Sequence, residues 1–581
     1  MIRSHTAGTS FLSILPAMVI LSLLTVPAHA ETKTATTMGG CKFSSDLALD
    51  VWVIRTTETG LKRELVGRPE QIGKTPSPQP LNIPRCLLWG ITPIGKADIK
   101  ALVLASRFCN NFPPALRLRE ASDADLAELK GMAGLRTLML GGTNITDAGL
   151  AHPKGMEGLG SLELWGTKIS GTGLVHLKGL KKLRDLEIGG RNTNITKADL
   201  SHLKDFTGLE SLELHGKTIR DADLVHLKNL WWLESLKLSG TSVTGAGLVH
   251  LKTLVGLKNL DLSNAAITDT DMVHLKDLVG LESLNFKFTK ITGTGLAHLK
   301  SLKRLRRVNL GFSKITDESM VHLKDLTGLE SLELGRTQIT DAGIAHLKNL
   351  VKLQVLALWS TQITDAGLAN LKGLVDLRTL MLQSTQITGA GLLHIKDMVL
   401  LRELSLCRIP GLTDASLSHL KGLKGLRVLD LDTTNITDAG VSHLKGLVGL
   451  QELDLGNTKI TDAGMAHLKA LTELQMLSLR ETGISDAGLA HIKGMTNLKT
   501  LKLASTKVSD AGLVHLSGLT ELQRLDFSGL NSAMNITDAG LVHLKGLVRL
   551  QELGLTLTNV TNAGLDDLRK ALPKTNITPR K

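Results

Sequence analysis

A repeat of 24 residues is the feature that most constrains the fold of this chain. The motif Ile-Thr-Asp-Ala-Gly-Leu, with variants, recurs eighteen times; fourteen of the seventeen spacings between its first residues are 24, and the others are 26, 25 and 28. Because every repeat carries the same apolar pattern, each should form the same small unit and pack against its neighbours. The motifs begin at Ile145, Ile169, Ile195, Ile219, Val243, Ile267, Ile291, Ile315, Ile339, Ile363, Ile387, Leu412, Ile436, Ile460, Ile484, Val508, Ile536 and Val560.

The unit Leu329–Lys352 shows how one repeat should fold. Leu329, Leu332 and Leu334 follow the pattern L-x-x-L-x-L, which predicts a short strand with alternating side chains directed inward. Thr337 falls where the chain must turn, so we expect its buried hydroxyl to hold backbone groups of neighbouring turns.

The second half of the unit predicts a helix of two to three turns. Thr340 is suited to be its N-cap, and Asp341 follows at the positive end of the helix dipole. Ile344, Leu347 and Leu350 form an apolar stripe at helical spacing, so this side of the helix should be buried.

Stacking these units predicts an α/β fold of the solenoid type. Parallel strands lie about 4.8 Å apart, whereas neighbouring helices need about 8–10 Å. The stack should therefore curve into a horseshoe, with parallel strands on the concave face and short helices on the convex face.

The full pattern, L-x-x-L-x-L-x-x-T-x-I-T-D-x-G-L-x-x-L-x-x-L-x-x, resembles leucine-rich repeat proteins over residues 116–568, in about 18–19 repeats. Its Thr-Ile-Thr-Asp motif is similar to exported bacterial proteins of the planctomycete type and to the repeats of F-box receptors. The first resemblance implies a recognition scaffold, and the second implies a substrate receptor of a ubiquitin ligase.

Residues 1–30 read as a signal peptide. Arg3 supplies a positive start, Phe11–Val26 is an apolar run, and a small-x-small cleavage site ends at Ala30. We therefore expect a secreted, periplasmic or cell-envelope protein with no transmembrane segment after signal removal. The alternatives are an uncleaved anchor and lipid attachment at Cys41.

Residues 31–115 lack the repeat and contain a proline-rich stretch, so we expect an irregular N-terminal cap. A disulfide between Cys86 and Cys109 would close a short loop in this cap; unpaired thiols are the alternative. Residues 569–581 should form a C-terminal tail.

Sixteen of the 19 histidines occupy one repeat position, which includes His346, and this position falls on the outer helix face. Helices 8–10 Å apart cannot bring two such side chains within about 2.1 Å of one zinc ion. We therefore predict a solvated polar position and no metal site, with a response to acid as the alternative. The net charge of +13 comes largely from lysines at the helix ends, without the interleaved aromatic residues of nucleic-acid binders.

Catalytic motifs are missing from the sequence. It contains no G-x-S-x-G, no H-E-x-x-H and no C-x-x-C, and Ala97 stands where a phosphate-binding loop needs Ser or Thr. We expect no enzyme activity, no catalytic residue and no cofactor.

The concave strand residues are the expected binding surface. Over all repeats, the two positions of Ser331 and Glu333 hold twelve acidic residues and four basic ones. This excess of negative charge favours a basic or polar partner. Val355, Trp359 and Met381 should form an apolar centre, as in interface hot spots. The candidate residues are Trp165, Glu163, Glu187, Glu213, Asp261, Phe288, Phe312, Glu333, Arg336, Val355, Trp359, Met381, Gln383 and Glu403.

We interpret the chain as a non-enzymatic, exported recognition scaffold, expected to be monomeric, that binds a protein partner through this concave face. A cell-envelope carbohydrate or anionic-polymer binder is the main alternative. A ligase-type substrate receptor and a cryptic enzyme are the others.

Overall fold

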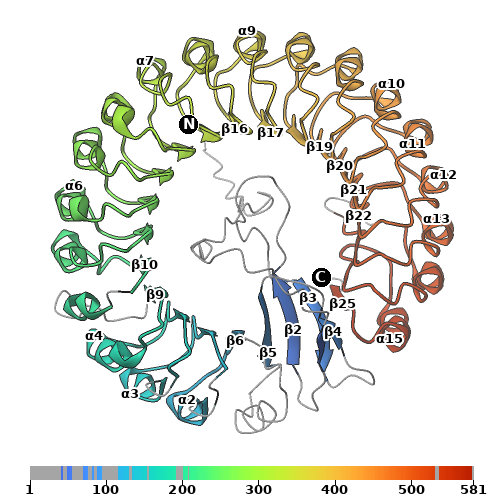
Figure 1. Cartoon of the computed structure of the whole chain (residues 1–581). Coiled ribbons are helices and arrows are strands. Elements are labelled where there is room, and N and C mark those ends of the chain that lie inside the picture. Colours follow the sequence, from blue (N-terminus) through green and yellow to red (C-terminus); the bar gives the residue numbers. More distant parts are fainter. Residues whose placement is uncertain are drawn as a thin grey trace, which may run out of the picture. The chain divides into compact units, whose positions relative to one another are not determined.

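A computed structural model gives the structure of the chain (Figure 1). It describes residues 115–190, 200–529 and 535–578, apart from breaks at 130–131, 133, 154–155 and 207, together with five strands between residues 41 and 93. The predicted signal peptide, Cys86 and Cys109 lie outside the described residues. The chain divides into two compact units, Met1–Leu236 and Lys237–Lys581, and the boundary falls inside the predicted solenoid.

The segment before the repeats contains a small sheet where we expected an irregular cap. Strand β2 (Leu49–Ile54) pairs antiparallel with β3 (Glu70–Thr75) and β5 (Leu88–Pro93). Strand β5 then pairs parallel with the first strand of the repeats, so this sheet continues directly into the repeat array. The remaining two strands, β1 (Cys41–Phe43) and β4 (Leu81–Ile83), pair antiparallel with each other.

In each unit, the strands of successive repeats pair parallel and in register. Leu332 lies opposite Leu356 in the next strand, and the same correspondence recurs along the array. The first unit contains β6 (Ala115–Arg117), β7 (Thr137–Met139), β8 (Ser161–Glu163), β9 (Asp185–Gly189) and β10 (Ser211–His215). Strand β11 (Ser235–Lys237) lies at the boundary. The second unit contains β12 (Asn259–Asp261), β13 (Ser283–Asn285), β14 (Arg307–Asn309), β15 (Ser331–Glu333), β16 (Val355–Ala357), β17 (Thr379–Met381), β18 (Glu403–Ser405), β19 (Val428–Asp430), β20 (Glu452–Asp454), β21 (Met476–Ser478), β22 (Thr500–Lys502), β23 (Arg524–Asp526), β24 (Glu552–Gly554) and β25 (Asn576–Thr578).

Each strand from β6 to β24 is followed by a short helical segment, which confirms the predicted alternation. In the first unit these are α2 (Asp123–Glu128), α3 (Asp147–Leu150), α4 (Gly171–Leu174), η3 (Val175–Gly179), η4 (Ser201–Asp205) and η5 (Asp221–Leu227), where η marks a 3₁₀ helix. In the second they are α6 (Gly245–Leu248), η6 (Val249–Thr253), η7 (Asp269–Leu275), η8 (Thr294–Ser301), α7 (Asp317–Met320), α8 (Asp341–Ile344), η9 (Ala345–Leu347), α9 (Asp365–Ala369), η10 (Gly389–His394), η11 (Asp414–Leu420), α10 (Asp438–Val441), η12 (Ser442–Leu444), α11 (Asp462–Leu468), α12 (Asp486–Leu489), α13 (Asp510–Leu513), η13 (Val514–Leu516), α14 (Asp538–Leu541), η14 (Val542–Leu544) and α15 (Asn562–Ala571). Within the described residues, no helix has the length and apolar character that a membrane crossing requires.

The solenoid runs further toward the C-terminus than expected. Strand β25 lies in the predicted tail and pairs parallel with β24. Ile577 on β25 is buried, so the last strand covers an edge that would otherwise present unpaired backbone groups.

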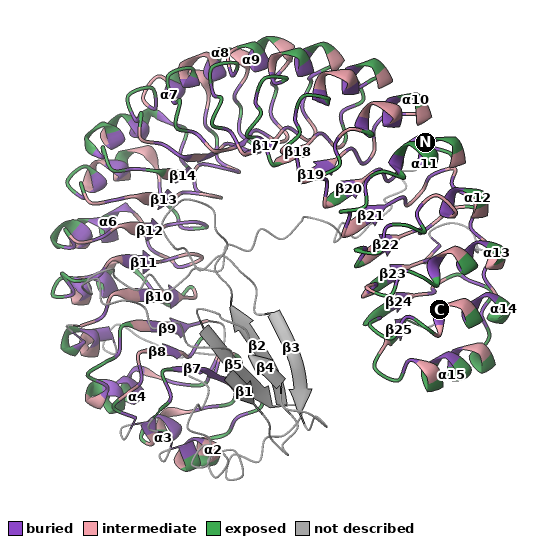
Figure 2. Cartoon of the chain, turned by 45° about the vertical axis from the view of Figure 1, so that its right-hand side comes forward, coloured by how far each residue is buried: buried purple, intermediate pink, exposed green. Residues whose placement is uncertain are grey.

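Within Lys237–Lys581, the strands line the inner side of the arc and the helices its outer side (Figure 1). The core lies between these two layers, where Figure 2 shows the buried residues. In the type repeat, Leu332, Leu334, Ile344 and Leu347 are all fully buried, as the periodicity predicted.

In most of the described coils, a residue with positive φ follows the strand and starts the turn. Arg336 has a φ of 55° and is one of twelve non-glycine residues with this conformation. Its backbone N–H donates to the carbonyl oxygen of Trp359 in the next coil. The hydroxyl of Thr337 donates to Leu334 O at 2.6 Å, so it holds its own turn and not, as we expected, a neighbouring one.

In twelve of the described coils, an aspartate links the coil to the next one; at the same repeat position, Gly171, Gly245, Gly293 and Gly389 carry no such carboxylate. The carboxylate of Asp317 accepts hydrogen bonds from the backbone N–H of Thr340 at 2.7 Å, from its hydroxyl at 2.6 Å and from the N–H of Gly343 at 3.0 Å. Thr340 in turn caps α8, as predicted, because its Oγ1 accepts from Ala342 N at 3.3 Å. The same link to the following coil starts from Asp123 and Asp147 in the first unit and from Asp269, Asp341, Asp365, Asp414, Asp438, Asp462, Asp486, Asp510 and Asp538 in the second.

This link explains the glycine of the repeat motif. A Cβ atom placed on Gly343 would lie 2.4 Å from Oδ1 of Asp317, well inside contact distance. The glycine therefore makes room for the carboxylate of the preceding coil and lets its own N–H reach that carboxylate.

Replacing the linking carboxylate should destabilise the array. We expect Asp317→Ala to lower the free energy of unfolding of its part of the solenoid by about 2–3 kcal/mol, because it leaves several donors without their charged acceptor. Urea denaturation and hydrogen exchange of the α8 amides measure this loss. Asp325→Ala is the matched control, since Asp325 is exposed in the same repeat. An equal effect of both changes would contradict the proposed role of the link.

Candidate functional site

Each coil displays three side-chain positions on its strand face, the surface formed by the successive strands of a unit. In the coil of β15, Ser331 and Glu333 lie on this face, half-buried. The third position, held by Gly335, lies between the strand and the left-handed residue Arg336, and we call it the pre-turn position. The charge count from the sequence covered only the first two positions.

Three aromatic side chains, Phe288, Phe312 and Trp359, form one cluster on the strand face of the second unit. The two phenylalanine rings stack with centroids 4.0 Å apart. Trp359 meets Phe312 edge-on, with centroids 5.1 Å apart and an interplanar angle of 70°. Phe312 is therefore the centre of this aromatic cluster, and Phe288, 45% exposed, is its most open member.

The repeat geometry brings these rings together. Phe288 and Phe312 occupy the left-handed position of adjacent coils, with φ of 60° and 57°, so their side chains leave the backbone in the same direction. Trp359 holds a pre-turn position and leans over the preceding coil. Gly335 makes this possible, because a Cβ there would lie 2.2 Å from the indole.

Charged groups surround the aromatic cluster. The ammonium of Lys287 lies 5.4 Å from the centroid of each phenylalanine ring, and the guanidinium of Arg336 lies 5.5 Å from Phe312. These are cation–π distances. Glu333 accepts a hydrogen bond from Asn309 Nδ2 at 2.7 Å, and burial raises the pKa of its carboxyl, although Lys287 opposes the shift.

The apolar centre expected on the next two strands offers less surface. Val355 and Met381 are half-buried, but Ala357 and Thr379 between them are only 2% and 7% exposed. The aromatic cluster is therefore the largest aromatic surface open to a ligand in this region. Val355 belongs to the coil of Trp359, and Met381 belongs to the coil after it.

Two of the predicted rim residues lie in the coils that follow Trp359. Gln383 holds the next pre-turn position and is half-buried. Glu403 accepts a hydrogen bond from the hydroxyl of Thr379 at 3.3 Å, and burial raises the pKa of its carboxyl.

Asp261, another predicted contact, has a structural role. Its carboxylate accepts from the backbone N–H of Ser263 at 2.8 Å and from Asn285 Nδ2 at 3.1 Å. Asn285 in turn accepts from the N–H of Lys287 at 3.0 Å. These side chains hold the turns that carry the aromatic cluster. Some of the acidic residues counted at the strand positions therefore stabilise turns.

The first unit carries a row of carboxylates. Glu163, Glu187 and Glu213 lie opposite one another on β8, β9 and β10. Trp165 donates its indole N–H to Glu163 and is 44% exposed, and it leans over Gly141 as Trp359 leans over its glycine. Burial, together with the charge of Glu187, raises the pKa of Glu163.

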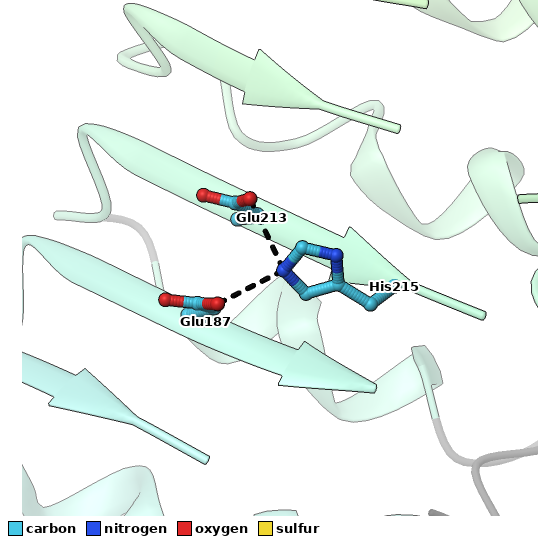
Figure 3. Close-up of side chains that lie close together, drawn as sticks. All are labelled: Glu187, Glu213 and His215. Carbon is cyan, nitrogen blue, oxygen red and sulfur yellow. Dashed lines mark hydrogen bonds and ion pairs between the residues drawn. The ribbon is translucent and has the colours of Figure 1, made fainter. Parts of the chain in front are cut away.

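His215 completes this row at the end of β10 (Figure 3). Its Nε2 lies 2.9 Å from Oε1 of Glu187 and 3.1 Å from Oε1 of Glu213. Burial opposes a charged imidazole, but the hydrogen bonds and negative charges of the two carboxylates outweigh it and raise the pKa of His215 to about 9.

The sequence analysis missed His215. His215 does not occupy the repeat position of the other histidines, such as His346, which lies in a helical segment. The structure places His215 at the pre-turn position, together with Trp165 and Trp359. Two carboxylates and an imidazole are also donors that can hold a divalent cation.

Family comparisons identify the repeats in the C-terminal part of the chain. Residues 424–484 match a model described as "Leucine rich repeat", and residues 494–517 match a second, described as "Leucine Rich repeat". No curated protein matches the chain. The similarity to planctomycete-type proteins and F-box receptors stays a prediction.

Solved structures with similar folds include an internalin from Listeria monocytogenes, 20% identical, with a TM-score of 0.42, covering 70% of this chain and 89% of that one. A leucine-rich repeat protein of Leptospira interrogans is 20% identical, with a TM-score of 0.41, and covers 79% of this chain and 100% of that one. The ectodomain of the Arabidopsis receptor kinase HAESA, in complex with a peptide hormone, is 19% identical, with a TM-score of 0.42, and covers 75% and 72%. At this level of similarity, these structures assign neither a ligand nor a partner.

The position of His215 predicts an unusual titration. We expect its imidazole to titrate near pH 9 in NMR spectra of histidine-labelled protein, and Glu187→Gln or Glu213→Gln to lower that pKa. Because the folded-state pKa lies above the unfolded value of 6.5, the stabilisation is fully present below about pH 6.5 and is lost as the pH rises through about 9.

Unfolding measurements provide the second readout. The free energy of unfolding should fall more between about pH 6 and pH 9.5 in the unmodified chain than in His215→Gln, which cannot titrate. A pKa of His215 near 6.5 would contradict the ion pairs in Figure 3.

Proposed function

We propose that this leucine-rich repeat protein is a non-enzymatic, exported scaffold that binds a protein partner on the strand face of its second unit. The aromatic cluster of Phe288, Phe312 and Trp359 is the observation that carries this proposal. Export rests on the apolar run in residues 1–30, and a cell-envelope or secreted location follows from it.

The aromatic cluster has the composition of an interface hot spot. Aromatic residues and arginine carry much of the energy of protein interfaces, especially where a polar rim surrounds them. Here Phe312 contacts two other rings, while Lys287, Arg336 and Glu333 supply the polar rim.

The rings are also held in place before a partner binds. Their backbone positions are set by the left-handed turn, and stacking fixes their relative orientation. A preorganised surface loses little conformational entropy on binding, so more of the contact energy contributes to affinity.

The rim indicates what kind of partner segment would fit. Cations lie directly over the rings, and a carboxylate lies one coil away. We infer a polar segment that places an apolar side chain on the rings and an acidic group near Lys287 or Arg336. The strand charges alone predicted a basic or polar partner. With this rim, we infer a polar partner segment that carries charges of both signs.

Removing a ring of the aromatic cluster should weaken capture. We expect Phe312→Ala and Trp359→Ala each to weaken binding of a captured partner by at least about 2 kcal/mol, or roughly 30-fold. The partner is isolated from cell-envelope extracts on the immobilised full chain, and its affinity is then measured with the purified partner.

Trp232→Ala is the matched control, since Trp232 is an exposed tryptophan, 57% accessible, in the first unit. Protease treatment should remove the captured material and glycosidase treatment should not. Capture that survives Phe312→Ala, or that is lost to glycosidase or to moderate salt alone, would favour the carbohydrate or anionic-polymer alternative.

A further inference from the structure

Two carboxylate oxygens and one imidazole nitrogen converge on the strand face of the first unit (Figure 3). The donor atoms of Glu187, Glu213 and His215 all lie within 4.8 Å of one another. Within the part of the chain that the structure describes, no other three acidic, histidine or cysteine side chains meet in this way. All three residues are half-buried, so the group is open to solvent on one side.

The sheet fixes the starting points of the three side chains. Glu187 on β9 and Glu213 on β10 lie directly opposite each other in register. His215 follows Glu213 by two residues, which places both side chains on the same face of the strand. Strands β9 and β10 have five residues each, whereas the other strands of the array have three, so His215 is still part of a strand.

Two glycines contact the backbone of His215. Its carbonyl oxygen accepts a hydrogen bond from Gly190 N at 2.9 Å. Gly189 lies opposite His215 with a φ of 105°, and a Cβ there would lie 2.1 Å from the same carbonyl oxygen. The close approach of β9 to β10 at this point therefore requires a glycine, and the imidazole is held over the carboxylates as a result.

The donor set selects a class of cation. Zinc binds histidine nitrogen and carboxylate oxygen at about 2.0–2.2 Å, usually with three protein ligands and one open position in sites that are not purely structural. Calcium and magnesium prefer oxygen ligands alone. The imidazole thus favours a borderline transition metal over a hard cation.

The separations of the imidazole nitrogen from the two carboxylate oxygens are close to those of ligands around one zinc ion. Bonds of about 2.05 Å at tetrahedral angles place two ligand atoms about 3.3 Å apart. Nε2 of His215 lies 2.9 and 3.1 Å from its two carboxylate partners, so a small outward movement of the side chains accommodates the ion.

We propose that Glu187, Glu213 and His215 form a zinc-binding site with one open coordination position. The two carboxylates balance the charge of the ion, and the imidazole supplies the nitrogen ligand. The fourth position is left to water or to a group from another molecule. This site lies in the first unit and is independent of the aromatic cluster and of the proposed protein partner.

Zinc titration of the full chain tests the site. After treatment with EDTA and removal of the chelator, isothermal titration calorimetry with ZnCl₂ should show one strong site per chain. We expect His215→Ala to weaken this binding by at least about 100-fold, and Glu187→Gln and Glu213→Gln to weaken it as well. Co²⁺ should give the visible absorption of a four-coordinate ion, and Ca²⁺ should not compete.

His346→Ala is the control for the many histidines on the helices and should leave the strong site unchanged. Glu187→Gln keeps the size of the side chain, so a circular dichroism spectrum like that of the parent protein separates loss of a ligand from loss of fold. The proposal is overturned if no stoichiometric zinc binding is found, if His215→Ala retains it, or if His346→Ala removes it equally.

Discussion

Twelve junctions of the array depend on the hydrogen bonds that an aspartate accepts from the following coil. A single coil of 24 residues cannot cover its own apolar residues, so it needs neighbours on both sides. Packing of leucines holds neighbours together without fixing their register closely. Asp317 adds a charged acceptor for two backbone N–H groups and one hydroxyl of the next coil. Because all three donors must reach the carboxylate at once, this contact sets the register between the two coils.

The left-handed turn determines which side chains are free for recognition. It recurs at the same position in most of the described coils, and the N–H groups of Phe288 and Phe312 are bonded to the next coil, so the backbone there is fixed whatever side chain it carries. Phe288 and Phe312 can therefore differ from their counterparts in other coils without disturbing the core. The scaffold and the displayed surface are in this sense separate parts of one sequence.

Periodic features were predictable from the sequence, and features that depend on contacts between coils were less so. The strand of Leu332, the cap at Thr340 and the buried Ile344 follow from spacing alone, and the structure confirms them. The partner of Asp317 lies 23 residues away and cannot be read from one repeat. The contact of Phe312 with Trp359 depends on the missing side chain of Gly335, and the ion pair of His215 with Glu187 joins two coils.

The aspartate links have a consequence for how such a chain changes length. A coil with this aspartate presents the same acceptor to its successor, and the Thr or Ser cap with its N–H presents the same donors to its predecessor, so coils of this kind fit next to one another. Asp510 still reaches Thr537 although four extra residues separate them. Gain or loss of such a repeat by unequal recombination therefore leaves the neighbouring junctions of this kind intact, and evolution can lengthen or shorten this part of the array without redesigning it.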